Sequence, residues 1–144
     1  MNRYAHAIFC DDIRQEVSGK TTMVGIYTGQ LVASEIPCVL PKICIALSLV
    51  TPIGRNFEEI IVTGNFNGVE IFKMGLSKHQ IEEIMAQAPD RAVPTSFFTV
   101  QLMAILSPFQ VEKAGKLILS VLADGEKLEC GGLEITQAPP GIVI

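Results

Sequence analysis

The sequence predicts an all-β fold: a β-sandwich of Greek-key, immunoglobulin-like type with about eight strands and one short inserted helix near residues 77–88. The first evidence is a set of three turn dipeptides, Ser18-Gly19, Asn67-Gly68 and Asp124-Gly125, each between β-type segments. Asn-Gly and Asp-Gly readily adopt the positive φ angles of tight hairpin turns. The second is the short spacing of the apolar segments, which proline-containing loops at residues 36–41 and 88–94 interrupt. A small closed barrel is the structural alternative.

The first predicted hairpin, residues 9–27, carries five of the eight Asp, Glu, Lys and Arg residues in the first third of the chain. Adjacent side chains on a strand point to opposite faces, so Asp11 and Asp12 cannot both reach one ion. Asp12, Arg14 and Glu16 recur at every second position and share one face. We therefore expect a ladder of opposite charges on this hairpin in preference to a calcium site, which needs six to eight converging oxygens.

Residues 60–63 and 69–72 flank the second turn, and residues 117–122 and 127–130 flank the third. Gly131-Gly132 then suggests a bulge or kink before one more strand. Two further segments, 42–50 and 97–106, are apolar at both even and odd positions. This pattern is typical of central strands covered on both faces. A helix, a loop or a second subunit should cover their outer face.

The single predicted helix begins with a capping box, because Ser77 and Gln80 have the Ser-x-x-Gln spacing. An apolar stripe that would pack on the sheet follows at helical spacing: Ile81, Ile84, Met85 and Ala88. Pro89 ends the helix. His79 falls on the opposite face, so we expect a solvent-exposed histidine.

Composition favours one domain, residues 1–144, that does not work as a solitary monomer. The chain is 49% hydrophobic and only 18% charged, against a typical charged fraction of about 25%. Part of the surface should therefore be buried against another copy or a partner. The apolar C-terminal residues Ile142, Val143 and Ile144 are candidates for that interface.

The net charge of −4 argues against nucleic-acid binding, which needs a basic face. No apolar run approaches the about 18 residues of a membrane span. The N-terminus lacks the long apolar region of a signal peptide. These features predict a cytoplasmic protein without nucleic-acid or membrane partners.

The sequence offers little evidence of catalysis or of a cofactor. The four cysteines include no CxxC pair, so we expect reduced thiols and no metal. Gly19-Lys20-Thr21 resembles the end of a phosphate-binding loop, but position 14 is Arg and the following residues continue as a strand. His6 and Cys10 would stand roughly 13 Å apart on one strand, too far for a catalytic pair.

One stretch carries a family resemblance: Phe9 to Glu16, then Gly19-Lys20, Gly25-Ile26-Tyr27 and Leu40-Pro41-Lys42. It resembles the opening of an uncharacterised, domain-of-unknown-function family of small bacterial and phage-related proteins with the signature FCDDIR-E…GK…GIY. The match covers residues 9–52. The resemblance implies a short bacterial or phage protein in the cytosol and assigns no catalytic residues.

These observations predict a non-enzymatic binding or interaction module, working as a homo-oligomer and binding no cofactor. A phage- or prophage-encoded protein that acts on a host protein is one version of this prediction. The alternative is a small-ligand-binding or metal-binding protein, or an enzyme, that uses the polar residues of the first hairpin. Those residues are Asp11, Asp12, Arg14, Glu16 and Lys20.

Overall fold

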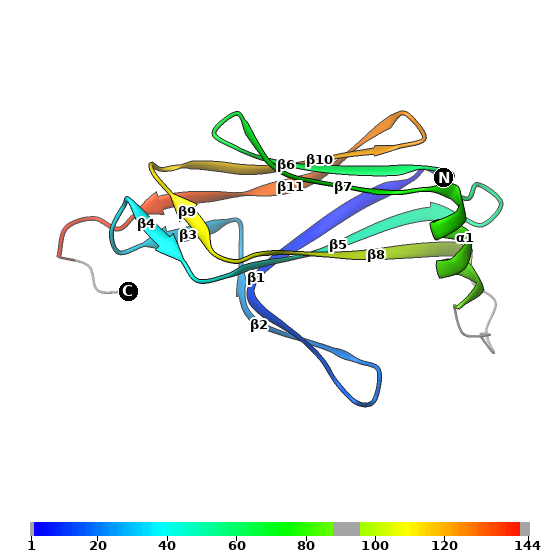
Figure 1. Cartoon of the computed structure of the whole chain (residues 1–144), viewed down its shortest axis with the longest axis horizontal. Helices are drawn as coiled ribbons and strands as arrows, with labels where there is room; N and C mark the ends of the chain where they lie inside the picture. Colours follow the sequence, from blue (N-terminus) through cyan, green and yellow to red (C-terminus); the bar gives the residue numbers. More distant parts are fainter. Residues whose placement is uncertain (1, 88–95, 142–144) are drawn as a thin grey trace.

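The computed structural model describes residues 2–87 and 96–141, which form two large sheets packed face to face (Figure 1). The four-stranded sheet has the order β2-β1-β5-β8, with β1 Tyr4–Gln15, β2 Thr21–Tyr27, β5 Ile43–Pro52 and β8 Phe97–Leu106. The five-stranded sheet has the order β3-β11-β10-β6-β7, with β3 Gln30–Ala33, β6 Ile60–Phe66, β7 Val69–Leu76, β10 Gly115–Ala123 and β11 Glu126–Gln137. The short strands β4 Cys38–Leu40 and β9 Phe109–Val111 pair at one end.

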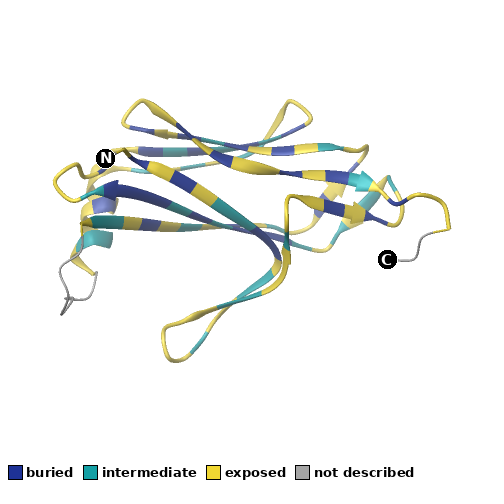
Figure 2. Ribbon diagram, turned by 180° about the vertical axis from the view of Figure 1, so that it is seen from behind, coloured by how far each residue is buried: buried dark blue, intermediate teal, exposed yellow. Residues whose placement is uncertain are grey.

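The hydrophobic core fills the space between the two sheets. Along β5, β6 and β10, alternate side chains point into this space, as the period of two requires. The fully buried residues of the core include Ile45, Leu49, Val62, Val100, Leu117, Val121 and Ile135. Figure 2 shows the resulting alternation of buried and exposed residues along the strands of both sheets. The predicted all-β sandwich is confirmed, while its immunoglobulin-like connectivity stays a prediction.

The three hairpins form where the turn dipeptides predict them. Asn67-Gly68 and Asp124-Gly125 each make a two-residue turn in which both residues have a positive φ. The angles are 51° and 81° in the first turn and 54° and 81° in the second. The first hairpin closes with a longer turn, residues 16–20, in which the amide N–H of Glu16 donates to the carbonyl of Lys20 at 2.8 Å. The predicted bulge lies in β11 at Gly131, where the register against β10 shifts between Ile118 and Ser120.

The helix α1, Lys78–Ala86, begins at the predicted capping box. Ser77 is the N-cap, and its side chain and that of Gln80 each bond the other residue's backbone N–H. Ile81 is fully buried against the core. Ala88 and Pro89 lie outside the described residues. No helix in the described ranges has the length and apolar character needed to cross a membrane.

Two predictions about the strands were wrong. The described residues form eleven strands, because β3, β4 and β9 contain only three or four residues each and leave no periodic signal. The strand at residues 97–106 has the predicted bounds but lies at the edge of its sheet, whereas β5 is central. On β8 the outer side chains Met103 and Ile105 are 42% and 61% exposed. The apolar pattern on both faces therefore indicated a central position correctly for β5 but not for β8.

Candidate functional site

The hairpin of β1 and β2 extends beyond the sandwich as an arm, which we define as residues 11–27. β1 pairs with β5 only from Tyr4 to Cys10, whereas it pairs with β2 from Phe9 to Gln15. The distal half of β1 is thus held by β2 alone, and the ribbon leaves the body of the protein (Figure 1). Figure 2 shows that its residues are exposed or half-buried, whereas the rest of β1 also includes buried residues.

Asp12 anchors the base of the arm to the body. Its carboxylate accepts a hydrogen bond from Lys42 Nζ at 2.8 Å and one from Arg14 Nε at 3.3 Å. Lys42 immediately precedes β5, so the first contact joins the arm to the central strand of the sheet. The hydrogen bond from Lys42, followed by that from Arg14, holds the pKa of Asp12 below its usual value.

Asp11 lies on the other face of the arm, where its carboxylate accepts a hydrogen bond from the Tyr27 hydroxyl. Burial, with Asp11 as the second cause, raises the pKa of Tyr27 to about 12, so the phenol remains a donor at physiological pH. Gly25, at φ 69°, makes this approach possible. A Cβ at that position would fall within van der Waals overlap of the Asp11 carboxylate.

Cys10 and Cys44 are opposite each other on β1 and β5, and both are fully buried. Their thiols point toward the base of the arm: Cys10 Sγ donates to the carbonyl of Asp12 at 3.4 Å, and Cys44 Sγ to that of Asp11 at 3.8 Å. Desolvation by burial, with Cys44 as the next cause, raises the pKa of the Cys10 thiol. Cys10 therefore packs as a neutral thiol beneath the arm, with Cys44 beside it.

A cleft of about 450 Å³ lies between the arm and the outer face of the four-stranded sheet, and we call it the arm cleft. Gly19, Thr21 and Met23 line it from the arm. Gln15 also reaches across from the arm, with its Nε2 at 3.7 Å from Met103 Sδ on β8. The arm thus covers part of the outer sheet face that the sequence predicted to be covered by a helix, a loop or a second subunit.

The floor of the arm cleft consists of two parallel rows of side chains that cross β1, β5 and β8. The strand register places His6, Ser48 and Gln101 in one row and Ile8, Ala46 and Met103 in the next. The first row offers hydrogen-bonding groups and the second offers apolar surface. No Asp, Glu, Lys or Arg side chain lines this cleft.

The residues that the sequence singled out do not line the cleft. Asp11, Asp12 and Arg14 fix the arm, and Lys20 is exposed at its turn. The expected charge ladder forms only in part, because the Glu16 carboxylate accepts a hydrogen bond from Thr22 Oγ1 at 2.8 Å. Ile142, Val143 and Ile144 lie outside the described residues.

The cleft residues that sequence reasoning missed come from strands far apart in the chain. His6, Ser48 and Gln101 are each flanked on both sides by apolar residues. A polar residue in an apolar strand is a weak signal, because it also occurs wherever a sheet face meets water. Only the pairing of β1, β5 and β8 brings the three side chains together.

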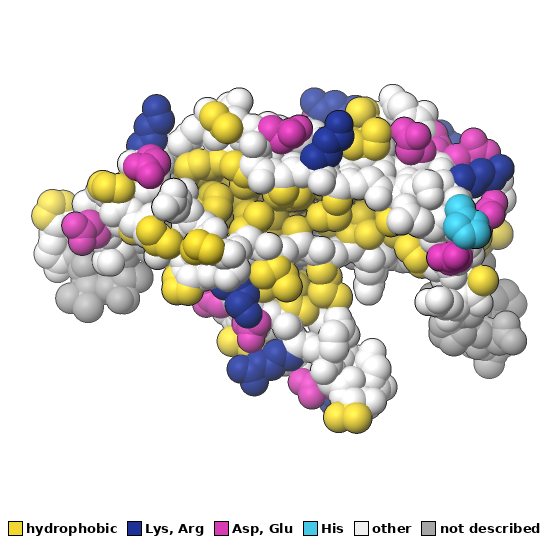
Figure 3. Space-filling model, viewed as in Figure 1, with side chains coloured by type: hydrophobic (Ala, Val, Ile, Leu, Met, Phe, Trp, Pro, Cys, Tyr) yellow, Lys and Arg dark blue, Asp and Glu magenta, His cyan; other side chains and the backbone are white. Residues whose placement is uncertain are grey.

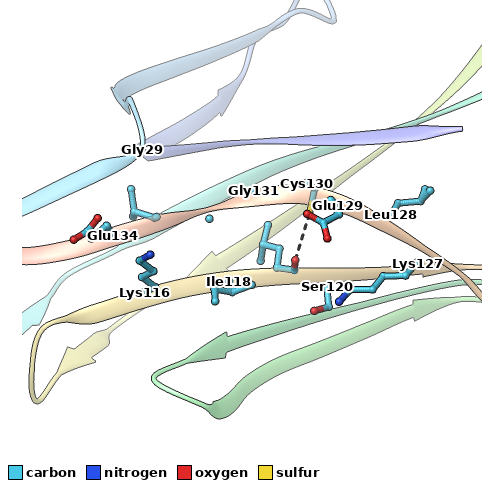
Figure 4. Close-up of a pocket in the computed structure, with 13 residues that line it drawn as sticks. Gly29, Lys116, Ile118, Ser120, Lys127, Leu128, Glu129, Cys130, Gly131 and Glu134 are labelled. Carbon is cyan, nitrogen blue, oxygen red and sulfur yellow. Dashed lines mark hydrogen bonds between the residues drawn. The ribbon is translucent and has the colours of Figure 1, made fainter.

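A second hollow, of about 360 Å³, lies at the β11 bulge on the outer face of the five-stranded sheet (Figure 4). Its polar lining mixes both signs of charge: Lys116, Ser120, Lys127, Glu129 and Glu134. Cys130 Sγ donates to the carbonyl of Leu119 at 3.7 Å beneath it (Figure 4). Among the described residues, no projecting hairpin covers this hollow as the arm covers the arm cleft. We therefore regard the arm cleft as the better candidate for a ligand site.

Arg3 forms a structural cluster at the opposite end of β1. Its side chain is only 4% exposed and contacts Asp124 Oδ2 at 2.8 Å and Thr51 Oγ1 at 3.1 Å. It also donates to the carbonyls of Arg55 and Asn56 at 2.9 and 3.0 Å. With its donors engaged by the protein itself, Arg3 stabilises the fold and offers little to a ligand.

Within residues 2–87 and 96–141, no three His, Cys, Asp or Glu side chains gather so that they could hold a metal ion. His79 is exposed on α1 as predicted, with Nε2 at 3.0 Å from Glu83 Oε1. Neither histidine is therefore part of a cluster of ligating side chains in the described part of the chain.

Comparison with known protein families gives one match, which covers most of the chain. Residues 5–136 match a family described as a family of unknown function, DUF6941. No curated protein and no solved structure matches the chain. The match extends well beyond residues 9–52, on which the resemblance rested. The chain belongs to this family of unknown function.

Proposed function

We propose that the protein is a non-catalytic, cytoplasmic binding module that holds an amphipathic segment of another protein in the arm cleft and works as a homo-oligomer. The observation that carries the proposal is the pair of rows on the cleft floor, one polar and one apolar, beneath a two-stranded arm. A volume of about 450 Å³ lies within the range of about 300–1,000 Å³ that is usual for ligand sites.

The absence of Asp, Glu, Lys and Arg from the lining favours a neutral ligand. An extended peptide that crosses the three strands can bond His6, Ser48 and Gln101 on one side and contact Met103 on the other. A phosphorylated or strongly anionic ligand would find no Lys or Arg side chain in this lining. A neutral, amphipathic peptide segment fits both rows. A role against a host protein, which the resemblance suggests, stays a prediction.

His6 and Ser48 are opposite each other on β1 and β5, which raises the question of catalysis. Nucleophilic catalysis by serine needs a hydrogen bond to the base and a third group that orients the imidazole. Among the described residues, no hydrogen bond joins His6 to Ser48, and no carboxylate lines the cleft. We therefore assign these side chains to ligand binding.

The alternative of a ligand or metal site in the acidic hairpin requires Asp11, Asp12 and Glu16 to converge. Asp12 is instead paired with Lys42, while Asp11 and Glu16 accept hydrogen bonds from the Tyr27 and Thr22 hydroxyls. Each carboxylate thus has a partner within the arm or at its base. This arrangement favours a structural role, which is to position the arm over the cleft.

Selection from a peptide library tests the proposal with two matched variants. Ser48 and Ser120 are both half-buried serines on the outer face of a central strand, one in the arm cleft and one in the bulge hollow. Peptides selected on the wild-type protein should bind Ser120→Phe with unchanged Kd and bind Ser48→Phe at least about tenfold more weakly. Unchanged binding to Ser48→Phe, or no enriched peptide at all, would contradict the proposal.

A further inference from the structure

In the described part of the chain the two large sheets end in four edge strands, and β8 is the longest of them and the least protected against pairing. Natural proteins protect sheet edges with charged residues, prolines, bulges or very short strands. Among these edges, β3 has four residues, β7 carries Glu70 and Lys73, and β2 belongs to the projecting arm. The ten residues of β8, in contrast, include no charge, no proline and no glycine.

An apolar seam runs along the same side of the molecule. β7 and β8 are the edges of the two sheets on this side, and hydrophobic side chains gather between them (Figure 3). Phe72 and Met74 from β7 and Leu102 from β8 are half-buried there. They line a small hollow that reaches the core residues Ile45 and Leu47. Apolar surface beside an unprotected edge is typical of a protein interface.

We propose that β8 is the homodimer interface: the β8 strands of two copies pair antiparallel around a two-fold axis. The two four-stranded sheets would then form one continuous sheet of eight strands. A second copy is the occupant that the strand itself favours, because an uncharged strand pairs with its own copy without repulsion. This inference rests on the oligomeric part of the proposed function and names the surface responsible.

The two faces of β8 restrict the register. Directly opposite residues of paired strands lie on the same face of a sheet, so one residue of β8 must lie opposite its own copy, with the axis between the two. An axis at Leu102 pairs residues 98–106 in full. It places Phe98 opposite Leu106 of the second copy on the core side, where these two half-buried side chains extend the seam. On the outer side it places Thr99 opposite Ile105 of the second copy.

The expected size of this pairing overlaps the range of specific protein interfaces. Alternate residues of an edge strand direct both backbone groups outward, so pairing over residues 98–106 creates about eight to ten hydrogen bonds. At about one hydrogen bond per 100–200 Å², this corresponds to roughly 800–2,000 Å² of interface. Specific interfaces of standard size bury about 1,600 Å².

Sedimentation and hydrogen exchange together test the inference on the full chain. The double variant Thr99→Lys/Ile105→Lys places like charges directly opposite each other at two sites of the proposed register. The control Thr28→Lys/Ile118→Lys makes the same changes at exposed positions away from β8. We expect the wild type and the control to sediment as dimers and the β8 variant to sediment as a monomer. Circular dichroism should show that this monomeric variant is folded.

Hydrogen exchange of the wild type carries the test even if the variant does not fold. A paired β8 protects consecutive amides of residues 98–106, whereas a free edge protects only alternate amides. The inference would be overturned if the wild-type dimer protected only alternate amides of β8. It would also be overturned if both double variants sedimented as monomers. In either case the protein would form its oligomer through another surface. A wild-type monomer would overturn it together with the oligomeric part of the proposed function. Neither Thr99 nor Ile105 lines the arm cleft, so peptide binding remains a separate test.

Discussion

Replacement of Arg3 by methionine should lower the free energy of unfolding by about 3 kcal/mol. Removing one partner of a fully buried ion pair costs roughly 3–5 kcal/mol; here the Arg3 side chain is 4% exposed and that of Asp124 is 25% exposed, so the remaining carboxylate is partly solvated. Asp124 would keep two hydrogen bonds, from the backbone N–H groups of Glu58 and Glu59 at 2.9 and 2.7 Å. We therefore expect a loss near the lower end of that range. Methionine fills much of the space over Phe57, whose ring lies 4.6 Å from the guanidinium.

Arg55 provides the matched control. It pairs with Glu126 at 3.4 Å, but both side chains are nearly half exposed, at 48% and 45%. Exposed pairs of this kind contribute under about 1 kcal/mol, so Arg55→Met should have little effect. Urea unfolding followed by far-UV circular dichroism gives both values at pH 7. If Arg3→Met destabilised the protein no more than Arg55→Met, the assignment of Arg3 as a structural clamp would be refuted.

The effect of Arg3→Met should also depend on pH with a defined sign. Partial burial alone would raise the pKa of Asp124, but the N–H groups of Glu59 and Glu58 and the Arg3 guanidinium outweigh it and lower the pKa. A lowered folded-state pKa contributes stability that is complete above the unfolded value of about 3.9 and is lost as pH falls through the folded value. The difference between wild type and Arg3→Met should therefore shrink below about pH 4.

Three further predictions concern the arm, the thiols and the helix. Carboxyl NMR should find that Asp12 titrates below the usual aspartate pKa, and that Lys42→Met moves its midpoint back toward that value, because Lys42 is the main cause of the shift. A thiol reagent should label Cys38 first in the native protein and then, only on unfolding, the buried cysteines Cys10, Cys44 and Cys130. Ser77→Ala should cost about 1 kcal/mol in urea unfolding, because it removes the helix cap.

Local signals predicted the elements that depend on local structure. Asn67-Gly68 and Asp124-Gly125 specify their turns by themselves, and Ser77 with Gln80 specifies the start of α1. The bulge at Gly131 also follows from residues adjacent in the chain. In each case the favourable interaction joins residues a few positions apart, so the sequence pattern contains the necessary information.

The features that the sequence did not predict depend on contacts between distant segments. The edge position of β8 is a property of strand order, and no periodicity within residues 97–106 reports that order. The arm cleft requires β1, β5 and β8 to align His6 with Ser48 and Gln101. The polar residues of the first hairpin looked like a site because of their density, whereas their partners identify them as supports for the arm. Asp12, with Lys42 as its partner, is the clearest example.

Methyl NMR of the methionines tests the central claim, ligand binding in the arm cleft, most directly. The chain has five methionines, of which Met23 and Met103 line the cleft from the arm and the sheet. Met74 lies in the β7–β8 seam and Met85 on α1. On addition of a selected peptide, the proposal predicts shifts of the Met23 and Met103 methyl signals while those of Met74 and Met85 stay in place. Shifts confined to Met74 or Met85, or no shift of Met23 and Met103 at saturating peptide, would contradict it.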